Sequence, residues 1–251
     1  YADVFDIDGH GRVESRQESA TVERLYLDLG VSDAVNLRAG IFLTPVGRWN
    51  LIHAAPLVWT TSRPLTTERP FDPNLTGIML SGSVFPSAGT LTYTVYDQFA
   101  GPIEGNPDFD PADHSVGGRL QYDADRGWSV GTSYLAALRN GDWSHLAGLD
   151  FLWSQRPLEI MGEAVFEAGE GSAPQWGFYL QPVLALTTRL ALVVRYEHYA
   201  APGPPPQVNI MTMGFAVRLV PTVVLKAEYQ VVDRHTEIAP AGFRASIAVL
   251  F

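Results

Sequence analysis

The sequence predicts an all-β protein, an antiparallel up-and-down transmembrane β-barrel of about 14 strands with short periplasmic turns and long external loops. Three observations lead to this prediction. Apolar and polar residues alternate along many short segments, the connectors between segments alternate in length, and aromatic residues gather near both ends of the segments. A period of two places successive side chains in two different surroundings, as in a strand between lipid and a lumen.

The final segment shows the alternation most clearly. Every second residue from Phe243 to Phe251 is apolar, whereas the positions between them include Arg244 and Ser246. About a dozen further segments precede it, and each is close to the 9–11 residues that a tilted strand needs to cross the hydrocarbon core. The apolar phase is therefore expected to face lipid.

In chain order, strands are expected at 20–31, 35–44, 76–86, 90–99, 114–123, 128–138, 143–154, 158–168, 174–187, 189–199, 208–220, 222–232 and 242–251. Bacterial barrels close with an even number of strands, so residues 1–8 are expected to add one more. Tyr1 already lies within the alternation, which predicts a first strand truncated at its N-terminus. No linker rich in Ser, Gly or charge divides the chain, so the prediction is a single barrel domain over residues 1–251.

The connectors are expected to alternate between short and long. Short ones are predicted at 32–34, 87–89, 123–127, 155–157, 187–188 and 221. Longer ones are predicted at 9–19, 45–75, 100–113, 139–142, 169–173, 200–207 and 233–241. Outer-membrane barrels keep their short turns on the periplasmic side, so this alternation places residue 251 at the periplasmic end.

Aromatic residues in the outward phase are expected at the two headgroup levels of a bilayer. Those near short turns are Tyr122, Trp128, Trp153 and Phe251, and those near long loops are Trp143 and Trp176. Pro182 interrupts the pattern, because proline cannot donate a hydrogen bond to a neighbouring strand. A bulge or another irregularity is predicted there.

The composition excludes several classes of protein. No run of 18 apolar residues is present, which excludes α-helical membrane spans. The chain has no cysteine, so neither a disulfide framework nor a thiolate metal site is available. The net charge of −10 without a basic cluster argues against nucleic acid as a partner. The hydrophobic content of 46% fits a barrel in which lipid-facing and lumen-facing residues alternate.

Two adjacent segments carry a family resemblance. LYLDLG at Leu25–Gly30, followed by LRAGIFLTPVG at Leu37–Gly47, resembles the phosphate-selective porin group and its porin-like relatives. In that group a strand pair with an Arg-x-Gly core leads into a Pro-x-Gly turn, and the terminal Phe251 resembles the signal by which outer-membrane proteins are recognised for assembly. The resemblance implies a Gram-negative outer-membrane β-barrel porin. Those porins are larger, and no Lys- or Arg-rich phosphate ladder is found here, so phosphate selectivity does not carry over.

The phase opposite to the apolar one is expected to line the pore. The predicted basic residues fall on strands that are neighbours in a closed barrel: Arg24, Arg38, Arg218, Lys226 and Arg244. The predicted acidic residues lie about half-way round: Asp150, Glu159, Glu163 and Glu167. Opposed charges across a pore create a transverse field that acts on polar solutes. In the alternative, lumen charges pair with neighbours, as Asp28, Glu228 and Arg195 beside Glu197 would.

The connector 45–75 is the longest and is the candidate constriction loop. About fourteen strands enclose a narrow water-filled path, and a loop folded inward narrows it further. The sequence allows two placements of this connector: it either folds into the barrel or forms an ordered external cap. The residues expected at the constriction are Arg48, Trp49, His53, Trp59, Arg63 and Arg69.

The remaining motifs predict no metal site, no cofactor and no enzyme. The segment 6–17 is similar to a calcium loop, but His10 and Gln17 stand at two ligand positions and no helices flank it. The acidic residues of loop 100–113 are most simply a solvated rim; they are Glu104, Asp108, Asp110 and Asp113. No His lies with a Ser and an acid at the spacing that nucleophilic catalysis needs, so no catalytic residue is predicted.

The predicted function is that of a porin in the outer membrane of a Gram-negative bacterium, a water-filled channel for passive diffusion of small hydrophilic solutes or ions. Its partners are outer-membrane lipid and these solutes, and it is either a monomer or a homotrimer. Two alternatives stay open. One is a barrel that acts as a structural scaffold or anchor in an envelope complex. The other is a channel for poorly polar small molecules, which apolar residues in the lumen phase permit: Phe42, Leu135, Val165, Val183 and Val193.

Overall fold

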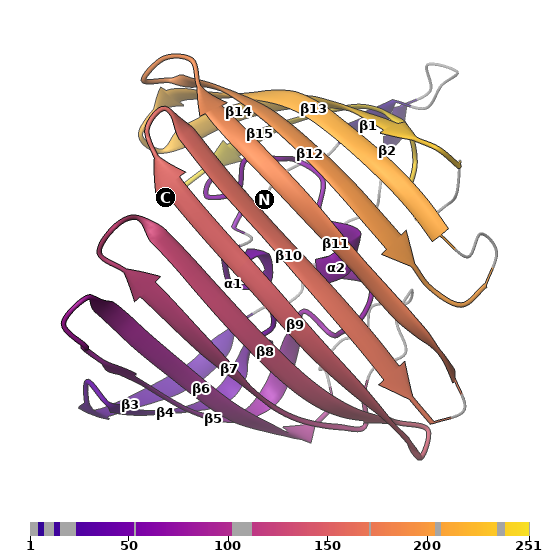
Figure 1. Ribbon diagram of the computed structural model, residues 1–251. Helices are drawn as coiled ribbons and strands as arrows, with labels where there is room; N and C mark the ends of the chain where they lie inside the picture. Colours follow the sequence, from indigo (N-terminus) through magenta and orange to yellow (C-terminus); the bar gives the residue numbers. More distant parts are fainter. Residues whose placement is uncertain are drawn as a thin grey trace.

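The computed structural model describes residues 5–7, 13–15, 24–52, 54–101, 112–170, 172–203, 207–234 and 239–250. Thirteen strands form one antiparallel sheet in which each strand pairs with its neighbours in sequence (Figure 1). They are β3 (Leu25–Ser32), β4 (Val35–Leu43), β5 (Asn74–Val84), β6 (Gly89–Ala100), β7 (His114–Ala124), β8 (Trp128–Arg139), β9 (Asp142–Gln155), β10 (Leu158–Gly169), β11 (Ser172–Ala185), β12 (Leu190–Ala200), β13 (Gln207–Val220), β14 (Val223–Val232) and β15 (Gly242–Val249).

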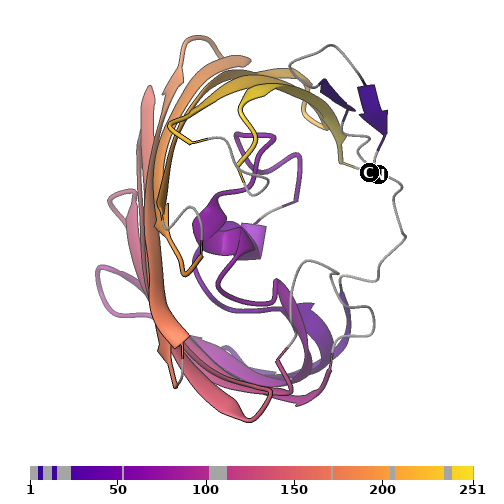
Figure 2. The same ribbon diagram turned by 90° about the vertical axis from the view of Figure 1, so that its right-hand side faces the viewer.

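The sheet curls into a barrel wall around a concave interior (Figure 2). Its outer face is apolar, because the exposed residues of each strand are mostly large hydrophobic ones. In β13, for example, Met211, Met213 and Phe215 are exposed, whereas Thr212 and Ala216 on the opposite face are buried. The alternation read from the sequence is therefore an alternation between lipid-type and interior surroundings.

The thirteen strands predicted from 20–31 to 242–251 are all present, with ends that differ by a few residues. The additional strand is not part of the main sheet. Phe5–Ile7 (β1) does form a strand, but it pairs with Val13–Ser15 (β2) in a separate two-stranded sheet. β1 lies close to β15 without joining its sheet. Among the described residues, β3 and β15 have no second partner strand.

Two connectors on the expected external side are shorter than predicted. Asn140 and Gly141 alone join β8 to β9, and Glu170 and Gly171 alone join β10 to β11. Asn140 and Gly141 both have positive φ, of 54° and 91°, which is the backbone that a two-residue hairpin turn requires. The strict alternation in connector length therefore fails at these two hairpins.

Pro182 interrupts the hydrogen bonding of β11 without a bulge. The ladder between β11 and β12 pairs Leu180 with Tyr196 and then Val183 with Val193, and it skips the two positions between. The register is the same on both sides of the gap, since the pairing continues with Leu184 and Leu192. The predicted irregularity is present as a local loss of pairing.

Aromatic side chains gather at both ends of the strands. Trp176, Phe178 and His198 form one cluster near the ends of β11 and β12, with the Trp176 and His198 ring centroids 4.7 Å apart. At the opposite end Tyr122 packs against Trp128 with centroids 5.5 Å apart. Phe251 lies outside the described residues. Among these residues, no helix combines the length and apolar character that a membrane crossing requires.

The outer face offers a direct test of the membrane-spanning assignment. Leu149 lies in the middle of β9 and is 65% exposed. Replacing Leu149 with Arg is expected to destabilise the folded protein by about 2–4 kcal/mol, the cost of a cationic side chain near the bilayer midplane. The measurement is a urea titration of the protein folded in phospholipid vesicles. Leu149→Ala is the matched control, and an Arg penalty no larger than the Ala penalty would contradict a lipid-facing position.

Candidate functional site

The site is built around the connector between β4 and β5, residues 44–73, which we call the inner segment. It lies on the concave side of the sheet and carries two short helices, α1 (Trp49–Ile52) and α2 (Leu65–Glu68) (Figures 1 and 2). Of the two placements that the sequence left open, the structure has the inward one.

Apolar contacts hold the inner segment at four places. Val46 and Phe71 are fully buried in a cluster with residues of the wall from β4 to β9. Trp49 packs with Met161 and Tyr179, Trp59 with Val183 and Val193, and Leu65 with Tyr199 and Val208. All five apolar residues of the lumen phase noted above are buried, and four of them belong to these clusters: Phe42, Leu135, Val183 and Val193. Their apolar character is explained by this packing.

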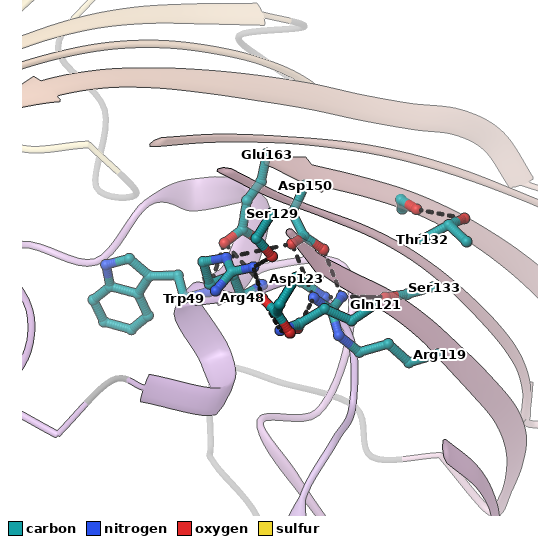
Figure 3. Close-up of polar contacts among 12 residues, drawn as sticks. Arg48, Trp49, Arg119, Gln121, Asp123, Ser129, Thr132, Ser133, Asp150 and Glu163 are labelled. Atoms are coloured by element: carbon teal, nitrogen blue, oxygen red, sulfur yellow. Dashed lines mark hydrogen bonds and ion pairs between the residues drawn. The ribbon is translucent and has the colours of Figure 1, made fainter. Parts of the chain in front are cut away.

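Three wall carboxylates bind the backbone of the inner segment. Glu163 of β10 accepts hydrogen bonds from the backbone N–H of Arg48 at 3.0 Å and of Trp49 at 2.5 Å (Figure 3). Glu228 of β14 accepts the N–H groups of residues 61 and 62, both at 2.8 Å. Glu197 of β12 accepts the N–H of Leu65, the first residue of α2, at 3.0 Å. Buried carboxylates and free backbone donors thus satisfy one another.

A buried ion pair supports the first of these anchors. Arg119 of β7 donates two parallel hydrogen bonds to Asp150 of β9, at 2.5 and 2.9 Å (Figure 3). The pair crosses β8 at Gly131, where a Cβ atom would lie 2.4 Å from the guanidinium. A side chain at this position would force the ion pair to shift. Asp150 pairs in register with Glu163, so the ion pair lies beside the carboxylate that holds Arg48 and Trp49.

Arg48 extends from the inner segment into this cluster. Its Nε lies 3.6 Å from Asp150, its guanidinium donates to Ser129, and it lies 3.9 Å from Asp123. The preceding Gly47 has a φ of 66°, and a Cβ atom there would lie 2.1 Å from a carboxylate oxygen of Glu163. The Pro-x-Gly turn of the sequence therefore serves to bring the inner segment against the wall.

The opposite wall has a second buried cluster. Arg195 of β12 is fully buried and donates to Glu197 at 2.6 Å. It also donates to the hydroxyl groups of Thr60 at 2.7 Å and Ser62 at 2.6 Å. Lys226 of β14 donates to the backbone oxygen of Thr60 at 2.9 Å. The inner segment is thus bound by charged groups of both walls.

The predicted basic residues have different surroundings. Lys226 is bound to the inner segment, and Arg38 forms an ion pair with Asp28 at 2.6 Å. Arg24 is exposed at the start of β3, and Arg218 donates to the backbone oxygen of residue 221. Arg244 is half-buried on β15 and lies in register with Glu228. The pairs Arg38–Asp28 and Arg195–Glu197 agree with the alternative in which interior charges pair locally.

The four predicted acidic residues are all engaged on the concave side. Asp150 and Glu163 belong to the cluster of Figure 3. Glu159 accepts a hydrogen bond from the indole N–H of Trp59 at 2.6 Å. Glu167 forms an ion pair with Arg139 at 3.3 Å and accepts a hydrogen bond from Gln175.

The predicted constriction residues lie along the inner segment. Arg63 donates to Asn50 and to the backbone of residue 67, and its guanidinium lies 5.1 Å from the Trp49 ring centroid. Arg69, at the end of α2, is half-buried. His53, together with Glu104, Asp108, Asp110 and most of the calcium-like segment 6–17, lies outside the described residues. Among the residues that the structure describes, no group of His, Asp or Glu has the arrangement of a metal site.

Sequence reasoning missed Arg119, Asp123 and Ser133, although a signal was present. Arg119, Gln121 and Asp123 occupy the inward phase of a strand whose outward phase was recognised from Tyr122. Applying the same phase to every strand would have added Arg119 to the interior charges. Its pairing with Asp150 also depends on Gly131, which reads in the sequence as an ordinary strand glycine.

Two cavities adjoin the inner segment on the side of β9 to β14. One, of about 280 Å³, opens among the short turns and is lined by residues 56–59 together with Arg156, Arg189 and Arg218. The other, of about 210 Å³, shares Leu57, Val58 and Trp59 with the first and is also lined by Arg48 and Glu159. Residues 57–59 thus separate two polar-rimmed spaces.

No family model and no curated protein matches the chain. Solved structures do match it. An anion-selective porin from Comamonas acidovorans has a TM-score of 0.62 at 11% identity, with 89% of this chain and 75% of that one covered. OmpF of Salmonella typhi has a TM-score of 0.68 at 10% identity, with 94% and 81% covered. The outer membrane channel DcaP of Acinetobacter baumannii has a TM-score of 0.60 at 10% identity, with 98% and 78% covered.

The fold is that of a porin β-barrel. At these identities the likeness concerns the fold alone, and it extends over nearly the whole chain. It supports a porin-like barrel in general and not the phosphate-selective group that residues 25–47 resemble. One further structure with this fold, OmpT of Vibrio cholerae, was solved in a trimer form; its TM-score is 0.64 at 9% identity, with 95% and 84% covered.

Proposed function

We propose that this protein is a porin of a Gram-negative outer membrane, a channel through which small hydrophilic solutes or ions diffuse passively. The inner segment is its constriction. The observation that carries the proposal is that a charged segment lies inside an apolar-walled barrel and is bound by ionic groups of both walls. Such an arrangement places fixed charge in a narrow interior, where low-dielectric walls keep the field strong.

The proposed pore-lining groups follow from the two cavities. Glu159 and Arg48 line the inner one, and Arg218 lines the one among the short turns. The remaining interior charges act mainly on the inner segment and on each other. We also propose that the protein assembles as a homotrimer, as OmpT of Vibrio cholerae, an outer membrane protein with this fold, does in one solved form.

A second function has its own support. The inner segment is packed by four apolar clusters and by buried hydrogen bonds, as a plug would be. A barrel closed in this way would serve as a scaffold or anchor in the cell envelope. Conductance separates the two functions.

The test is conductance of the purified protein in a planar bilayer under a salt gradient. A porin gives stepwise ohmic conductance, and a scaffold gives none. Glu159→Gln is expected to move the reversal potential toward anion preference and Arg218→Gln toward cation preference, because each removes one fixed charge beside the path. Both shifts should shrink between 0.1 M and 1 M salt, as the Debye length falls from ~10 Å to ~3 Å.

Arg126→Gln, in the turn between β7 and β8 and away from both cavities, is the matched control. If the reversal potential changed with Arg126→Gln but not with Glu159→Gln or Arg218→Gln, the assignment of Glu159 and Arg218 as lining groups would be wrong.

A further inference from the structure

The cavity among the short turns combines cationic side chains with an apolar floor. Arg156 and Arg189 lie in the turns after β9 and β11, and Arg218 lies two residues before the end of β13. The floor is formed by Pro56, Leu57, Val58 and Trp59 of the inner segment, with Ala191, Ala216 and Val224 from the wall. None of the residues that line this cavity is acidic.

The three guanidinium groups have no carboxylate partner within the described part of the chain. Within the same described residues, their side chains form a single hydrogen bond, which Arg218 donates to the backbone oxygen of Pro221 at 3.2 Å. Elsewhere in the interior the arginines at 38, 119, 139 and 195 are each paired with an acid. All three arginines are exposed at this opening. Three like charges around one opening without a counter-ion attract an anion.

We propose that this cavity binds a small organic carboxylate with an apolar body. Guanidinium groups bind a carboxylate through paired, charge-assisted hydrogen bonds, and the apolar body lies against residues 56–59. The volume of about 280 Å³ lies at the low end of ligand pockets, which limits the ligand to one ring or a short chain. The inference rests on the proposed function and deepens it, since it names the class of solute that enters from the short-turn side.

Leu57, Val58 and Trp59 line both cavities and lie between them, so a solute that leaves the first cavity passes these residues. Beyond them the second cavity presents both Arg48 and Glu159. Trp59 separates the two spaces and is held in place by its hydrogen bond to Glu159. A carboxylate therefore binds most strongly in the first cavity, beside Arg156, Arg189 and Arg218, before it reaches Glu159.

The experiment is calorimetric titration of the full chain, folded in zwitterionic detergent at low ionic strength. The probes are cyclohexanecarboxylate, acetate, cyclohexylmethanol and inorganic phosphate. Cyclohexanecarboxylate is expected to bind at least about tenfold more tightly than each of the other three, because only it has both a carboxylate and a ring to bury. Arg189→Gln and Arg218→Gln should each weaken its binding by about tenfold, the effect of losing one charged hydrogen bond.

Arg126→Gln is the matched control and should leave binding unchanged, since Arg126 does not line the cavity. Leu57→Ser should reduce the preference for cyclohexanecarboxylate over acetate. Circular dichroism verifies that each variant is folded.

Several results would overturn the proposal. Equal binding of cyclohexylmethanol would mean an apolar site, and equal binding of phosphate would mean an unspecific basic patch. Displacement of the carboxylate by phosphatidylglycerol added to the micelles would assign the arginines to lipid headgroups. Binding without conductance would leave this inference standing and remove the porin function, whereas conductance without binding would remove only this inference.

Discussion

Replacing Asp150 with Asn is expected to lower the free energy of unfolding by about 3–5 kcal/mol, the usual cost of leaving one member of a buried ion pair without its partner. The Asp150 side chain is fully buried, and it accepts two hydrogen bonds from Arg119 and faces Arg48. An amide at this position keeps the shape of the side chain but removes the buried negative charge that pairs with Arg119 and faces Arg48. Unfolding by urea in phospholipid vesicles, followed by tryptophan fluorescence, measures the difference.

Two controls separate this effect from general damage. Asp123→Asn removes a carboxylate from the same cluster, but its side chain is 42% exposed, so the loss should stay below about 1 kcal/mol. Combining Arg119→Gln with Asp150→Asn removes both charges and should recover part of the lost stability. If the double variant were as unstable as the sum of the single ones, the two residues would act independently and the ion pair would not be the cause.

Replacing Glu228 with Ala is expected to free part of the inner segment and to raise the conductance of the proposed channel. Glu228 accepts the backbone N–H groups of Thr61 and Ser62, and each hydrogen bond to a charged group is worth about 1.5–3 kcal/mol. Losing even one of them raises the population of the released segment by about tenfold or more. Single-channel recordings should therefore show a larger-conductance state that is rare in the unaltered protein.

A disulfide can test whether release of the segment is the cause. Thr61 and Ser246 have hydroxyl oxygens 2.9 Å apart, and the chain contains no cysteine that would compete. In the Glu228→Ala background, Cys at both positions should abolish the larger state when oxidised and restore it when reduced. A larger state that persists in the oxidised protein would exclude movement of the inner segment at this anchor.

The pattern of single residues determined the strands. Period-two alternation depends on each residue's own side chain, so it located the thirteen strands and their outward faces, including the exposed phase of β13 and β15. Turn positions also followed from local chemistry, as at Pro221 and at the Pro-x-Gly turn of residues 45–47. The strands were therefore predicted well. Lys226 and the four predicted acids lie on the concave side, and their role in lining a pore stays a prediction.

Only the tertiary structure decided what these interior residues contact. Whether Arg119 reaches Asp150 depends on the register of three strands and on a glycine between them, and whether Glu228 binds Thr61 depends on the path of a distant connector. The same holds for β1, which pairs within a local hairpin instead of extending the sheet. An alternating pattern specifies which side a residue faces. It carries no information on long-range partners, because these depend on how the whole sheet closes around the segment inside it.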